Sequence, residues 1–269
     1  MAYRRVDDAR LYYEWTPGDP ERTVVFLNGV MTTTSSWELY TPLWAGGGWG
    51  VLLHDFRGQL QSDKPPGPYT FRRHVDDLVT LLDSLGIGAV HLVGTSYGGE
   101  VALHVAVEHP GRVRSLAVID SASEIDALLE AFIRSWLLLC RRETAREFYW
   151  TAIPSLYSSG FLQANRGFLE ERLESFTALP EEYFTGQRSL YETFLALNLT
   201  ARLPEITSPT LVVCGEEDVL KPPRFSRLIA GRVPRSELVL LPRCGHVAIF
   251  EEPEALKSLL FGFTMKHAP

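Results

Sequence analysis

Hydrophobic and polar positions alternate in two patterns along the chain. Short apolar runs, rich in Val, Leu and Ile, are bounded by Gly, Pro, Asn or Asp, which predicts strands. Stretches in which apolar residues recur every three to four positions lie between these runs and predict helices. Strands that are apolar throughout are typical of a parallel sheet covered on both faces. The runs with this pattern are 23–27, 50–54, 89–93, 113–119, 210–214 and 237–241.

The order of these elements predicts an α/β fold. Helices are expected at 71–85, 100–108 and 253–263, so that helices separate successive strands. Alternating strands and helices give a mostly parallel sheet with helices on both faces. Two further segments, 3–6 and 11–15, are expected to form an antiparallel edge of this sheet.

One region, 123–206, departs from the alternation because it contains no convincing strand. It is rich in Leu, Phe, Tyr, Trp and Glu and predicts a helical cap (lid) between two core segments, 1–122 and 207–269. A long insertion between core strands often covers a binding site. The alternative is a set of packing helices over an open site. Expected helices are 125–142, 145–153, 168–176 and 189–198, and the candidate substrate-binding residues are Trp136, Trp150, Tyr157 and Tyr191.

Composition excludes several classes of function. The 269 residues carry a formal net charge of -7 and no basic block, which argues against nucleic acid as a partner. No apolar run has the roughly 20 residues of a membrane helix, and the N-terminus lacks the apolar segment of a signal peptide. Three widely spaced cysteines have no metal-ligand spacing and favour reduced thiols in a cytoplasmic protein. No cluster of ligand residues suggests a metal or an organic cofactor, and we expect neither. A monomer and a homodimer both remain open.

The stretch HLVGTSYGGEVALHVA, residues 91–106, is the strongest candidate for chemistry. Gly94, Ser96 and Gly98 form a G-x-S-x-G pattern where a predicted strand passes into a predicted helix. Such a turn holds its serine in strained backbone, and glycines two residues away on either side avoid a clash. The start of the helix also favours developing negative charge. We therefore predict that Ser96 is a nucleophile.

A serine hydroxyl needs a base to become a good nucleophile. Among seven histidines, His246 lies just beyond the last predicted strand, at the edge of the sheet where ligand sites of α/β proteins collect. His54 also lies at a strand end and is the strongest competitor. We predict His246 as the base.

The base in turn needs an acid to orient it. Asp218 lies a few residues beyond the strand 210–214, in a loop that can approach His246. Asp120 ends the strand 113–119 and is the alternative, although it could instead cap the start of the insertion. We predict Asp218 as the acid.

The order Ser96, Asp218, His246 resembles that of the α/β-hydrolase superfamily, and the resemblance extends over nearly the whole chain. It implies an eight-stranded sheet with a helical cap inserted after strand six. The segments HDFRGQLQSDKP (54–65) and GHVAIFEEPE (245–254) are similar to the loop after strand four and to the histidine loop of that family. Within the first segment, Gln59 stands where histidine is frequent.

An oxyanion hole requires two backbone donors. One is expected to be the N–H of Tyr97, directly after the nucleophile. The resemblance implies the N–H of Val30 as the other, in the segment NGVMTTTSSW (28–37), which resembles the 3-oxoadipate enol-lactonase-like branch.

These residues predict a serine hydrolase that cleaves a small-molecule carboxylic ester or lactone through an acyl-enzyme. A carbon–carbon bond hydrolase, a thioesterase and an acyltransferase could use the same triad. A non-catalytic small-molecule receptor on the same scaffold is the alternative from another class, because a fold does not dictate a function.

Overall fold

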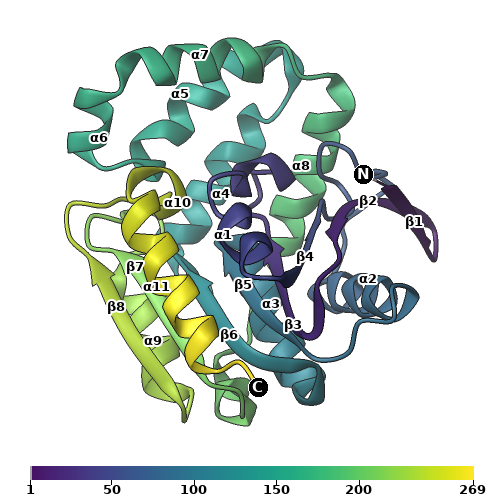
Figure 1. Ribbon diagram of the computed structural model, residues 1–269. Helices are drawn as coiled ribbons and strands as arrows, with labels where there is room; N and C mark the ends of the chain where they lie inside the picture. The colour runs from purple at the N-terminus through teal and green to yellow at the C-terminus, as the bar shows by residue number, and fades with distance from the viewer. Residues whose placement is uncertain (1) are drawn as a thin grey trace.

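The computed structural model describes residues 2–269 and contains one eight-stranded sheet (Figure 1). The strand order is β1-β2-β4-β3-β5-β6-β7-β8, and pairing is parallel from β4 to β8 and antiparallel at the β1–β2–β4 edge. The predicted fold class is therefore confirmed. The strands are β1 (Ala2–Val6), β2 (Ala9–Thr16), β3 (Asp19–Leu27), β4 (Trp49–His54), β5 (Val90–Thr95), β6 (Val113–Ile119), β7 (Thr210–Gly215) and β8 (Ser236–Leu241).

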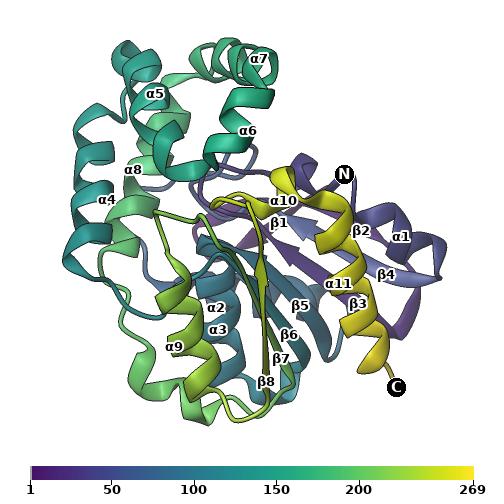
Figure 2. The same cartoon turned by 90° about the vertical axis from the view of Figure 1, so that its left-hand side faces the viewer.

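Helices cover both faces of the sheet (Figure 2). One face carries α2 (Phe71–Ser84), α3 (Tyr97–Glu108) and α9 (Pro223–Arg232), and the other carries α1 (Thr41–Gly46) and α11 (Pro253–Lys266). Side chains of a strand alternate between the two faces. Val25 and Leu27 thus lie in one buried cluster, and Val24 and Phe26 lie in the other. This double burial explains why the strands are apolar throughout.

A helical insertion follows β6 and lies above the sheet (Figure 1). Helix α8 begins at Glu181, before the expected start at residue 189, and Gly186 lies inside it. In the structure Gly186 packs against the backbone of Gly58, where a Cβ atom would collide with the Gly58 carbonyl. The helices of the insertion are α4 (Ala127–Leu139), α5 (Ala145–Leu156), α6 (Ser159–Ala164), α7 (Arg166–Thr177) and α8 (Glu181–Phe194).

The structure bears on membrane spanning and on the state of the cysteines. Within residues 2–269, no helix has the length and apolar character needed to cross a membrane. Cys140, Cys214 and Cys244 are buried free thiols.

Candidate active site

The turn between β5 and α3 presents Ser96. Its backbone has φ 50° and ψ −118°, a strained conformation for a residue with a side chain. A Cβ atom on Gly94 would collide with the Gly98 carbonyl, and a Cβ atom on Gly98 would collide with the end of β3. The two glycines are therefore required by the close approach of three backbone segments, which holds the serine beyond the edge of the sheet.

Ser96, His246 and Asp218 form one hydrogen-bonded chain. His246 Nε2 lies 3.0 Å from Ser96 Oγ, and His246 Nδ1 lies 2.8 Å from Asp218 Oδ2. The other carboxylate oxygen of Asp218 accepts the backbone N–H groups of Leu220 and Lys221 at 2.9 and 2.8 Å, so its orientation is fixed. This arrangement can pass a proton from the serine to the imidazole while the carboxylate holds the imidazole tautomer.

The competing histidine lies elsewhere. His54 is fully buried at the end of β4, where its ring packs edge-on against Phe56. Neither ring nitrogen has a hydrogen-bond partner among residues 2–269. Burial lowers the pKa of His54 to about 4, so the ring stays neutral as part of the core.

The competing acid has another task. The carboxylate of Asp120 accepts the backbone N–H groups of Gly215 at 2.9 Å and Ala248 at 3.2 Å. It thereby joins the end of β7 to the short helix α10 (Ala248–Glu251). Burial and the nearby charge of Asp218 raise the pKa of Asp120 well above its ordinary value. Asp120 supports the loop that carries His246, and Asp218 makes the contact with the ring.

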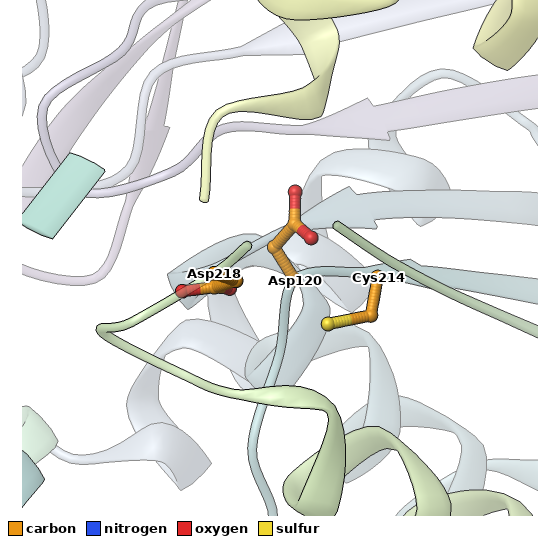
Figure 3. A group of neighbouring side chains, drawn as sticks. All are labelled: Asp120, Cys214 and Asp218. Atoms are coloured by element: carbon orange, nitrogen blue, oxygen red, sulfur yellow. The ribbon is translucent and has the colours of Figure 1, made fainter. Parts of the chain in front are cut away.

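Asp120, Cys214 and Asp218 converge at the ends of β6 and β7 (Figure 3). Their potential metal-ligand atoms lie within 4.8 Å of one another. Both carboxylates are already occupied by hydrogen bonds, and the thiol of Cys214 contacts the carbonyls of Gly215 and Lys221. Burial raises the pKa of Cys214, whereas a metal ligand must be a thiolate. The donor set therefore fits a hydrogen-bonded support for His246 and does not fit a cation.

The two expected oxyanion donors both lie beside Ser96. Tyr97 is the first residue of α3, where N–H groups have no partner within the helix. Val30 lines the same small cavity as Ser96 and Tyr97. A Cβ atom on the preceding Gly29 would come within 3.5 Å of the Ser96 Cβ, which places this loop directly against the serine.

Gln59 orders the Val30 loop. Its side-chain amide donates to the carbonyls of Gly29 at 2.8 Å and Thr32 at 3.1 Å. Its oxygen accepts from Asn28, whose amide also bonds Asp55. Gln59, which stands where histidine is frequent in the family, therefore helps to position the loop that carries Val30.

A cavity of about 320 Å³, here called the main cavity, opens onto Ser96 and His246 beneath the helical insertion. This volume is within the range of small-molecule sites, which begins near roughly 300 Å³. Of the candidate substrate-binding residues, Trp136 and Tyr157 line the main cavity. Tyr191 lines a second, smaller cavity beside Ser96, and Trp150 is 44% exposed and lines neither cavity. The insertion therefore shapes the pocket, although Trp150 has no part in it.

Lys221 and Glu100 are a buried ion pair that the sequence analysis missed. Lys221 Nζ lies 2.8 Å from Glu100 Oε1 and 3.0 Å from Ser96 Oγ, and both side chains are almost fully buried. The ammonium also lies 4.7 Å from the ring centroid of Phe194. Ser96 Oγ can accept a hydrogen bond from this ammonium while it donates its own proton to His246.

A weak signal for Glu100 exists in the sequence. It lies four residues after Ser96 in a mostly apolar helix, so both residues are on one face. Lys221 has no such signal, because its approach to Ser96 depends on the path of a loop 125 positions away.

We expect Lys221→Met to lower the free energy of unfolding by about 3–5 kcal/mol at neutral pH, because it leaves the buried carboxyl group of Glu100 without its partner. Burial raises the pKa of Glu100, and Lys221 opposes that effect. Without Lys221, the folded protein should bind a proton at Glu100 that the unfolded chain does not hold at neutral pH. The deficit should therefore shrink as the pH falls toward the ordinary value of 4.5. Urea unfolding at several pH values measures this.

The matched control is the double variant Lys221→Met with Glu100→Gln, which keeps an acceptor for the N–H of Ala122. It should recover most of the lost stability at neutral pH. Equal stability of the single and double variants would show that the ion pair does not hold this site together.

Comparison with known proteins identifies the family. The profile described as alpha/beta hydrolase fold matches residues 22–253. "Putative carbamate hydrolase RutD" of Caulobacter vibrioides is 30% identical over 218 residues, which are 80% of each chain. The crystal structure of MGS-M2, an alpha/beta hydrolase enzyme from a Medee basin deep-sea metagenome library, has a TM-score of 0.91 at 27% identity and covers 97% of this chain and 96% of that chain.

The enol-lactonase from Burkholderia xenovorans LB400 has a TM-score of 0.85 at 23% identity, covering 98% of this chain and all of that chain, and shares the fold. The profile match spans most of the sequence, from within β3 to the first residue of α11. This chain belongs to the α/β hydrolase fold family.

Proposed function

We propose that this protein hydrolyses a small carboxylic ester or lactone through an acyl-enzyme on Ser96. The observation that carries the proposal is the hydrogen-bonded chain from Ser96 through His246 to Asp218, which opens into the main cavity. Such a chain supplies a nucleophile, a base and an orienting acid in contact with space for a substrate.

The geometry supports a two-step reaction. Ser96 Oγ attacks the carbonyl carbon while His246 Nε2 takes the hydroxyl proton, and Asp218 stabilises the imidazolium. The backbone N–H groups of Val30 and Tyr97 bind the oxyanion. The intermediate collapses as His246 gives its proton to the leaving alcohol oxygen, which forms the acyl-enzyme. His246 then takes a proton from water, the hydroxide attacks the acyl carbon, and Ser96 leaves with that proton.

The walls of the main cavity favour an apolar group on the substrate. Trp136, Tyr149, Tyr157, Phe176 and Phe250 are among its lining residues. Each methylene buried against such walls contributes about 0.8 kcal/mol. An aryl or short alkyl group would gain several such contacts, while a very long chain would exceed the volume of the cavity.

Carbamates are a second candidate substrate class, because a relative at 30% identity carries the name of a carbamate hydrolase. A carbamate has the same carbonyl and alkoxy leaving group as an ester, with nitrogen on the acyl side. The same steps would give a carbamoyl group on Ser96, which water then removes.

The test compares p-nitrophenyl butyrate with p-nitrophenyl N-propylcarbamate. For an ester hydrolase we expect catalytic release of nitrophenol from butyrate and, after an acid quench, a butyryl group on the peptide that contains Ser96. Release should be faster from butyrate than from the carbamate, and the reverse preference would favour the second class. Binding of either compound without turnover or acylation would contradict hydrolysis and favour a receptor.

A further inference from the structure

Lys221 is a charged residue in direct contact with the nucleophile. Its ammonium donates to Ser96 Oγ at 3.0 Å, the same distance that separates this oxygen from His246 Nε2. The reaction described above assigns roles to His246, Asp218 and two backbone N–H groups, and this contact is left without one. A donor bonded to a reacting oxygen stabilises most the states in which that oxygen carries the most negative charge.

The ammonium of Lys221 is held in place by an acidic and an aromatic partner. Glu100 Oε1 lies 2.8 Å from Nζ, and the ring centroid of Phe194 lies 4.7 Å from it. The same oxygen of Glu100 accepts the backbone N–H of Ala122 at 2.8 Å, which fixes the carboxylate. Lys221 is 3% exposed. The cation is therefore a fixed part of the site and not a mobile surface group.

The charges of this ion pair suit a donor beside the catalytic base. An ammonium has three donors and no lone pair, so it does not compete with His246 for the proton of Ser96. His246 becomes positively charged during the reaction, and an unbalanced cation bonded to the same serine oxygen would oppose this change. Because Glu100 balances the charge, Lys221 supplies a strong donor without adding net charge beside the imidazolium.

The strength of the contact between Lys221 and Ser96 changes along the reaction. In the free protein the acceptor is a hydroxyl oxygen. In the acyl-enzyme it is the alkoxy oxygen of an ester, which accepts weakly because its lone pair is delocalised into the carbonyl. After water has attacked the acyl carbon, the C–Oγ bond breaks, its electron pair passes to Oγ, and His246 transfers to Oγ the proton that it took from water. Oγ gains negative charge as the bond breaks and becomes a strong acceptor again.

This change affects the two halves of the reaction unequally. In acylation the ammonium already bonds the hydroxyl in the starting state, so little further stabilisation is available. In deacylation the contact is weak in the starting state and strong in the transition state. Only an interaction that is stronger in the transition state than in the ground state accelerates a step.

We propose that Lys221 is a further catalytic residue, which stabilises the oxygen of Ser96 as the leaving group of deacylation. Lys221 keeps its proton throughout and donates a hydrogen bond to Oγ, while His246 carries out the proton transfer. The proposal rests on the proposed acyl-enzyme mechanism and assigns to Lys221 the step in which that intermediate is hydrolysed.

The test uses the double variant Lys221→Met with Glu100→Gln, which removes the ammonium without leaving a buried carboxyl group unpaired. The backbone N–H of residue 221, which donates to Asp218 Oδ1, is retained. At saturating p-nitrophenyl butyrate, kcat is measured together with the fraction of enzyme that carries a butyryl group after an acid quench. Dividing kcat by this fraction gives the rate constant of deacylation, whereas kcat/KM reports binding and acylation alone.

We expect the rate constant of deacylation to fall by roughly tenfold to hundredfold, the value of a hydrogen bond from a charged group. The value of kcat/KM should stay within about threefold of the wild-type value, because acylation gains little from the ammonium. A purely structural role of Lys221 would instead slow both steps together. Lys221→Gln with Glu100→Gln removes the charge but keeps a polar side chain, and it should slow the same step selectively.

Lys257→Met with Glu254→Gln is the matched control. It makes the same two changes in an ion pair of 2.8 Å on α11, and neither residue lines the main cavity. Both kcat/KM and the rate constant of deacylation should stay within about twofold of wild type, because a surface ion pair contributes little.

The outcomes separate this inference from the function on which it rests. If the double variant deacylates at the wild-type rate, or if kcat/KM falls as far as the rate constant of deacylation, Lys221 does not act on the leaving oxygen and the hydrolase proposal stands. If the wild type releases nitrophenol without ever carrying a butyryl group on Ser96, the acyl-enzyme mechanism is wrong and the inference falls with it.

Discussion

We expect Ser96→Ala to remove nearly all ester hydrolysis while the protein stays folded. The substitution deletes the hydroxyl oxygen that would attack the carbonyl carbon, and loss of such a nucleophile lowers kcat by about 10⁶. Alanine is no larger than serine, so the turn between Gly94 and Gly98 should keep its shape. The measurements are kcat for p-nitrophenyl butyrate and the urea midpoint of unfolding.

Ser258→Ala provides the control, since it makes the same change at an exposed position on α11. It should retain wild-type activity. A folded Ser96→Ala variant with a tenth of the wild-type activity would remove Ser96 as the nucleophile and direct attention to a water activated by His246.

Asp218→Asn should lower kcat by roughly 10⁴. Asp218 Oδ1 accepts two backbone N–H groups, and the amide oxygen of asparagine would take that place. The amide NH₂ would then face His246 Nδ1 and donate to it, so the ring proton would move to Nε2. A protonated Nε2 cannot accept the proton of Ser96.

Asp120→Asn is the comparison that decides between the two acids. Both oxygens of Asp120 accept backbone N–H groups. In asparagine one of these oxygens becomes an NH₂ group, which would face a backbone N–H and could not accept its hydrogen bond. We expect a loss of about 1–3 kcal/mol in the free energy of unfolding with a much smaller change in kcat. A larger loss of kcat in Asp120→Asn than in Asp218→Asn would show that Asp120, and not Asp218, is the acid that orients His246.

The local sequence determines the strands and the turn that holds Ser96. Apolar runs such as Val113–Ile119 form strands because both faces of the sheet are buried, and this burial leaves a pattern in adjacent residues. Gly94 is equally local, since the clash that it avoids is with Gly98, a few residues along the chain. Gly98 instead avoids a clash with the end of β3, which is distant in the sequence. The order of these elements was therefore sufficient to predict the fold class and the helical insertion.

The sequence reduced the candidate base and acid for Ser96 to two histidines and two aspartates, but it did not show which of them lie beside the serine. His54 and His246 both follow strands, as do Asp120 and Asp218, and nothing in the sequence states where a side chain points. In the structure His54 packs into the core, and the carboxylate of Asp120 is occupied by backbone donors. Only the path of the chain after each strand brings His246 and Asp218 to Ser96 and keeps the other histidine and aspartate away from it.

Tertiary structure alone decided the environment of the reacting atoms. Glu100 and Lys221 are 121 positions apart, and they meet because α3 and the loop after β7 converge at one edge of the sheet. Trp136 and Tyr191 likewise come from two helices, α4 and α8, and line one small cavity beside Ser96. Strand and turn patterns reflect interactions between near neighbours in the chain, whereas pockets and buried ion pairs depend on how distant segments pack against one another.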